Sequence, residues 1–110
     1  MLAKAIPAYA RLAVEAAAHE VYFRTRLTAG HNRRDVEAAW TEALKTTQRV
    51  ELAVSGNGQQ GFSKWTRRQP YRQRTMTLCG RDVHAGMRAD ARDALADVQK
   101  TVDDLLGGRL

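Results

Sequence analysis

The sequence predicts a mainly α-helical fold, an antiparallel three-helix bundle with a basic β-hairpin or extended arm between the second and third helices. Three observations predict it. Apolar side chains recur at steps of three and four in three segments, which is the period of a helix face. A glycine-rich stretch from Ser55 to Gly61 interrupts that pattern. Positions 52–81 then hold six basic residues and no acidic one. At 110 residues, the chain has room for one domain, 1–110.

The first two helices are expected at about 3–28 and 33–54. Pro7 lies early in the first helix, where a missing amide hydrogen is least costly. Gly30 marks a turn, and Asn32 is a good N-cap for the second helix, with Asp35 near its positive end. Trp40 lies in the second apolar stripe and is an expected core anchor. Two helices joined by so short a turn should pack antiparallel.

The arm is expected at 55–80 and the third helix at about 82–106. Pro70 argues against a continuous helix through the arm. Residues 74–79 alternate polar and apolar side chains and include two threonines, which favour a strand. These features predict an irregular hairpin that turns around Gln69–Tyr71, or an extended loop. Asp82 can cap the third helix, whose apolar stripe runs from Val83 to Leu105.

The positive charge of the chain is concentrated in the arm. Residues 1–51 carry eight basic and six acidic side chains, and residues 82–110 carry four basic and six acidic ones, so the middle segment accounts for the net charge of +6. Such a segment attracts anionic partners. Arginine also forms planar, bidentate contacts with phosphate or carboxylate, and aromatic rings can stack on bases or anchor a protein interface. The candidate partner-binding residues are Phe62, Lys64, Trp65, Arg67, Arg68, Tyr71, Arg72 and Arg74.

Three interpretations of these residues remain open. They could contact nucleic acid, or they could dock on a protein surface. The arm could instead be a solvated, charged loop whose aromatic side chains fold back over the helices. If the residues dock on protein, substitution of Trp65 should abolish binding and a single arginine change should do little. If they contact phosphates, each of Arg67, Arg68 and Arg72 should weaken binding by a similar amount.

Catalysis finds little support in the sequence. Gly56-x-Gly58-x-x-Gly61 matches a dinucleotide-binding pattern, but that site needs a helix directly after the glycines, and residues 62–70 are not expected to form one. His19-Glu20 begins a zinc-protease pattern whose second histidine is replaced by Phe23. Cys79 is expected to be a half-buried strand residue rather than a nucleophile. We therefore expect no catalytic residues, no metal ion and no cofactor, and we expect that the protein is not an enzyme.

The C-terminal half resembles the small head–tail joining proteins of tailed phages, the gpW-like group. The residues that carry the resemblance are Ala53-Val-Ser-Gly-Asn-Gly-Gln59, the hairpin-like Arg74-Thr-Met-Thr-Leu-Cys79, and Arg81 at the start of the Val83–Leu106 helix. The long first helix and the length of the arm depart from the short family members. Both features fit better with the larger, all-helical adaptor proteins that occupy the same place in the virion.

The resemblance implies a structural adaptor of a phage virion, a head–tail connector that docks on portal or tail proteins and is a homo-oligomer when assembled. It implies a location in the virion or the host cytoplasm. The alternative is a nucleic-acid-binding module that uses the same residues, and a third hypothesis is a small inhibitor that occupies a nucleic-acid site on an enzyme. No apolar stretch approaches the length of a membrane span, so no membrane partner is expected.

Overall fold

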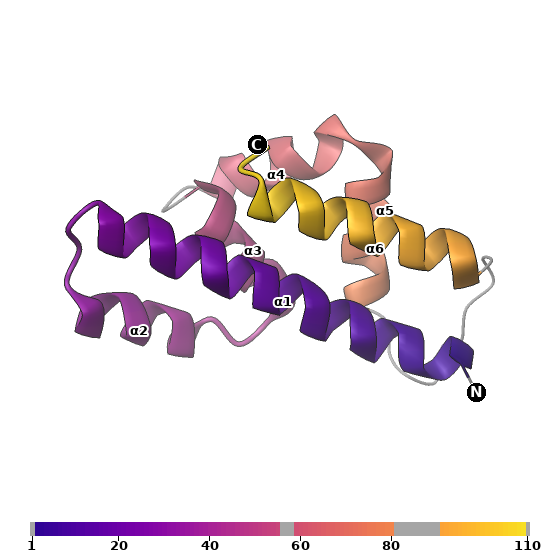
Figure 1. Ribbon diagram of the computed structural model, residues 1–110, viewed down its shortest axis with the longest axis horizontal. Coiled ribbons are helices and arrows are strands. Elements are labelled where there is room, and N and C mark those ends of the chain that lie inside the picture. The colour runs from indigo at the N-terminus through magenta and orange to yellow at the C-terminus, as the bar shows by residue number, and fades with distance from the viewer. Residues whose placement is uncertain (1, 56–58, 81–90, 110) are drawn as a thin grey trace.

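The computed structural model describes residues 2–55, 59–80 and 91–109, and these residues form six α-helices (Figure 1). In chain order the helices are α1 (Leu2–Thr28), α2 (Arg33–Glu42), α3 (Thr46–Ser55), α4 (Gln59–Arg68), α5 (Pro70–Cys79) and α6 (Ala91–Leu106). The described residues contain no β-strand. The predicted three-helix bundle with a β-hairpin or extended arm is therefore wrong.

The long helix α1 is the axis of the molecule, and α6 lies beside it and runs in the same direction (Figure 1). α2 follows α1 back along its other side, α3 crosses behind α1 toward the start of α4, and α4 and α5 lie behind α6. The core is formed where these helices meet α1 and α6. Its buried residues are Ile6, Ala10, Val14, Ala17, Ala18, Val50, Trp65, Met76, Leu78, Cys79, Ala94, Val98 and Leu105.

The predicted second helix is broken in two. Asn32 caps α2 as expected, because its side-chain oxygen accepts a hydrogen bond from the backbone nitrogen of Arg34 at 2.8 Å. The helix then stops at Glu42, and the side chain of Gln48 accepts bonds from the backbone nitrogens of Leu44 and Lys45, both at 3.0 Å. Gln48 thus satisfies donors that a continuous helix would have used internally. Neither glycine nor proline marks this break.

Within the predicted arm, residues 59–68 and 70–79 form the helices α4 and α5. Pro70 is at the first turn of α5, where its fixed φ suits a helix and its missing amide hydrogen costs nothing. The threonines predicted to favour a strand bond back along the helix instead: Thr75 donates to the carbonyl of Tyr71 at 2.8 Å and Thr77 to that of Gln73 at 2.9 Å. Cys79 is accordingly a buried helix residue.

Two further expectations change with this fold. A helix does begin within the glycine-rich stretch, since α4 starts at Gln59, but the element before it is helix α3 and not the strand that a dinucleotide site needs. Residues 56–58 and the start of the predicted third helix at 82–90, including its proposed cap Asp82, lie outside the described residues. From Ala91 to Leu106 the third helix is present as predicted.

Candidate functional site: the cationic face of α4

Helix α4 separates its aromatic side chains from its charged ones. Phe62, Trp65 and Thr66 are spaced three and four residues apart, so they share one face, which packs toward the core. Lys64, Arg67 and Arg68 lie on the opposite side and are exposed. We call these three residues the cationic face of α4. Two of the three are in the last turn, where positive charge also stabilises the helix dipole.

Trp65 is a core residue and not a surface anchor. Only 2% of its surface is exposed, and its indole nitrogen Nε1 donates to the backbone carbonyl of Arg109 at 3.2 Å. The aromatic side chains therefore lie as the third interpretation expects, folded over the core, although they are on helices and not on a loop. A partner therefore cannot reach the Trp65 ring in this fold.

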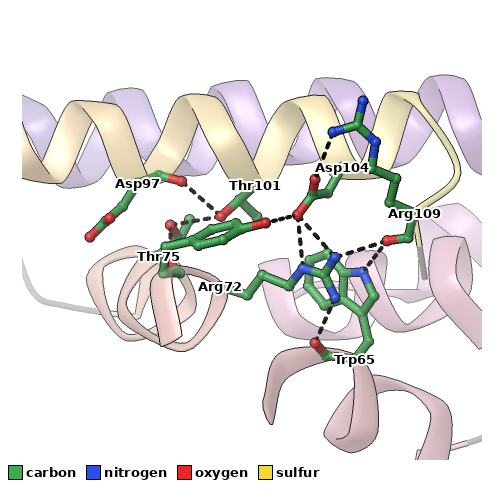
Figure 2. Close-up of polar contacts among 8 residues, drawn as sticks. Trp65, Arg72, Thr75, Asp97, Thr101, Asp104 and Arg109 are labelled. Carbon is green, nitrogen blue, oxygen red and sulfur yellow. Dashed lines mark hydrogen bonds and ion pairs between the residues drawn. The ribbon is translucent and has the colours of Figure 1, made fainter. Parts of the chain in front are cut away.

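Arg72 is buried in a polar network that joins α4, α5 and the end of α6 (Figure 2). Its Nε and Nη2 donate to Oδ2 of Asp104 at 3.1 and 2.9 Å, while Nη1 donates to the carbonyl of Trp65 at 3.0 Å. Nη2 also donates to the carbonyl of Arg109 at 3.0 Å. The guanidinium lies over the indole ring, 4.7 Å from its centroid. Every nitrogen of this arginine has a partner inside the protein.

Tyr71 and Arg74 also bond to α6. The Tyr71 hydroxyl donates to Oδ2 of Asp104, and this bond, more than burial, raises the pKa of Tyr71 because it requires the neutral hydroxyl. Arg74 is exposed but forms two bonds with the Asp97 carboxylate, at 2.7 and 3.0 Å. Those bonds are the main reason that the pKa of Arg74 is raised.

The structure therefore divides the eight predicted residues into three groups. Tyr71, Arg72 and Arg74 contact carboxylates of α6, and Phe62 and Trp65 pack inward. Lys64, Arg67 and Arg68 remain on the surface. Within residues 2–55, 59–80 and 91–109, neither Lys64 nor Arg67 forms an ion pair.

The sequence pattern did not indicate the α6 residues that complete the network. Asp104 is 4% exposed, and Thr101 and Thr75 are completely buried and hydrogen-bonded to each other at 2.9 Å (Figure 2). Polar side chains at buried helix positions resemble solvent-facing ones in a hydropathy pattern. One indication was available: positions 94, 98, 101 and 105 have helical spacing, which places Thr101 on the apolar face.

The described residues offer little catalytic chemistry. Burial raises the pKa of the Cys79 thiol to about 12, so the nucleophilic thiolate is disfavoured. A groove of about 780 Å³ lies between α5 and α6, and the described residues that line it include no histidine, cysteine or serine. No group of three or more potential metal ligands is present in the part of the chain that the structure describes. Among the same residues, no helix is long and apolar enough to cross a lipid bilayer.

Comparison of the chain with models of protein families, with curated protein sequences and with solved structures finds no match.

Proposed function

We propose that this protein is a non-catalytic binding module that contacts the phosphates of nucleic acid through the cationic face of α4. The observation that carries the proposal is that the candidate binding residues of α4 and α5 differ in their exposure. Its aromatic side chains and Arg72 are occupied in the core, whereas Lys64, Arg67 and Arg68 are exposed together on one helix face. Phosphate contacts need exposed cations and no aromatic anchor.

The charges around this face strengthen the argument. Positions 52–81 contain no Asp or Glu, so no carboxylate in the same stretch of chain repels a phosphate. The acidic residues Asp97 and Asp104 of α6 are engaged with Arg74 and Arg72 on α5. Arginine at two of the three positions allows bidentate phosphate contacts.

The test is a fluorescence-anisotropy titration of random duplex DNA at several salt concentrations. Three phosphate contacts predict a slope of log affinity against log salt of about −2.7, which is roughly a 40-fold loss between about 50 and 200 mM salt. Substitution of Lys64, Arg67 and Arg68 by glutamine should each reduce the slope by about 0.9, whatever the DNA sequence.

The matched controls are Arg34→Gln and Lys45→Gln, which remove the same charge from exposed positions on or next to α2. They should leave the slope unchanged. If the controls weaken binding as much as the α4 variants do, the net charge of the protein binds DNA and the cationic face is not a site. No binding at low salt by the folded protein refutes the proposal outright.

A second candidate function is the virion adaptor, a head–tail connector that docks on portal or tail proteins. The observation that favours it is the helical architecture of the described residues, which agrees with the larger helical adaptors that the long first helix suggests. In this case the same cationic face would dock on an acidic protein surface, because Trp65 is not available as an anchor. The affinity for poly-L-glutamate distinguishes the two candidate functions. A face that docks on acidic protein binds poly-L-glutamate about as tightly as DNA, whereas a phosphate-binding site binds DNA more tightly.

A further inference from the structure

Helix α1 carries a second apolar stripe that faces solvent. The outward residues Ala5, Tyr9, Leu12 and Ala16 are all exposed, and the exposed fractions of Tyr9 and Leu12 are 52% and 73%. Their spacing of four, three and four residues is that of the a and d positions of a coiled coil. The only polar side-chain group among these four residues is the Tyr9 hydroxyl. Exposed helix positions ordinarily carry charged and polar residues.

The same spacing continues along α1 to His19 and Phe23, and there a helix covers it. Trp40 of α2 lies against both rings, with centroid distances of 5.0 Å to His19 and 6.1 Å to Phe23. α2 begins at Arg33, close to the C-terminal end of α1, and is only 10 residues long. The exposure of Tyr9 and Leu12 means that no helix of the described residues covers the N-terminal half of the stripe in this way.

We propose that a second copy of this chain covers it, with the two α1 helices packed antiparallel about a two-fold axis. The positions are self-complementary in that arrangement. With the axis between Ala10 and Arg11, Tyr9 of each copy faces Leu12 of the other, and Ala5 faces Ala16. Antiparallel coiled-coil packing pairs a with d positions in the same manner, and the alanines leave room for the tyrosine rings.

The flanks of the stripe favour this pairing as well. Glu15 is engaged with Arg49 and with the hydroxyl of Thr46. Because its charge is already matched within one copy, a second α1 does not bury an unpaired carboxylate there. One helix pair makes a small interface, so we expect a reversible dimer with a dissociation constant in the micromolar range. The dimer presents two cationic faces, but neither proposal depends on the other.

Sedimentation equilibrium of the full chain over a wide concentration range tests the proposal. The wild type should pass from monomer to dimer with increasing concentration. Leu12→Glu places a charge in the interface twice per dimer and should weaken association by at least about 100-fold. The matched control is Leu106→Glu, another exposed leucine, on α6 beside Arg24 and about 18 Å along α1 from Leu12; it should dimerise as the wild type does.

The register is tested by a compensating pair. Tyr9→Lys alone should also dissociate the dimer, whereas Tyr9→Lys/Leu12→Glu should restore it, because each new lysine then faces a glutamate of the other copy. A wild type that stays monomeric at every concentration overturns the proposal. So does a control that dissociates as readily as Leu12→Glu, or a double variant that does not re-associate. Circular dichroism confirms that each variant is helical before its association is measured.

Discussion

The ion pair between Arg72 and Asp104 gives the sharpest stability prediction, because a second pair between the same two helices, Arg74–Asp97, has an exposed arginine. Both side chains of the buried pair are 5% exposed, and Arg72 is held by four hydrogen bonds. Loss of one partner of such a pair costs about 3–5 kcal/mol, since the other charge stays buried. Arg72→Met leaves Asp104 the Tyr71 hydroxyl and the Arg109 guanidinium at 3.6 Å, which favours the lower end, about 3 kcal/mol.

That loss converts into a large change in melting temperature. An unfolding entropy of about 2.1 cal/mol/K per residue gives about 0.23 kcal/mol/K for a chain of 110 residues, so the melting temperature should fall by about 13 °C. The control is Arg74→Met, which removes an arginine from the same helix and breaks a pair with the same neighbour, α6. The Arg74 side chain is 61% exposed, so this change should cost less than about 1 kcal/mol, or about 4 °C.

Differential scanning calorimetry and urea unfolding measure both variants. The double variant Arg72→Met/Asp104→Leu should be more stable than the sum of its single changes predicts, because no unpaired charge is left behind. Equal shifts for Arg72→Met and Arg74→Met would refute the reasoning, since the Arg72 guanidinium is buried with four hydrogen bonds and the Arg74 guanidinium is exposed with two.

Three further predictions concern other sites. The raised pKa of Tyr71 means that the folded state favours the neutral hydroxyl. The free energy that this hydroxyl contributes to folding is therefore complete below about pH 10 and is lost as the pH rises through the raised pKa. Urea unfolding across this pH range should show a steeper loss of stability for the wild type than for Tyr71→Phe. The Cys79 thiol, with a pKa of about 12, should react slowly with a thiol reagent at neutral pH and rapidly in urea; fast reaction of the native protein would contradict its burial. Gly30→Ala should cost about 1 kcal/mol in urea unfolding because φ at Gly30 is +92°; an unchanged midpoint would mean that the turn rearranges.

The sequence predicted the helices whose buried faces are apolar. α1 and the described part of the third predicted helix lie where the three-and-four spacing indicated, and Asn32 caps α2 as expected. The break before α3 was not predictable in the same way. It is stabilised by the side chain of Gln48 and by Arg49, whose Nε donates to the carbonyl of Ala43 at 2.7 Å. Both residues are common within helices, so their presence does not predict a helix end.

The arm was mispredicted because its buried positions are partly polar. In α5 the inward residues include Arg72, Thr75, Met76 and Cys79, at steps of three, one and three. These steps are helical, but Arg72 and Thr75 count as polar in a hydropathy pattern. What is left of the apolar pattern is Met76 and Leu78, which are two residues apart, as on one face of a strand. The partners that allow an arginine and a threonine to be buried here, Asp104 and Thr101, are 32 and 26 residues away. Only the tertiary structure brings them together.

The same contacts change what the uneven charge of the chain means. The sequence places an excess of bases at 52–81 and an excess of acids at 82–110, which by itself favours an external anionic partner for the basic segment. In the structure, Asp97 and Asp104 meet Arg74 and Arg72, so part of that imbalance is the attraction between α5 and α6. A cation that is matched inside the fold has no charge to offer a partner at close range. Binding is therefore expected at α4, where Lys64 and Arg67 are exposed and form no ion pair with a described residue, and charge reversal on α4, not on α5, should abolish it.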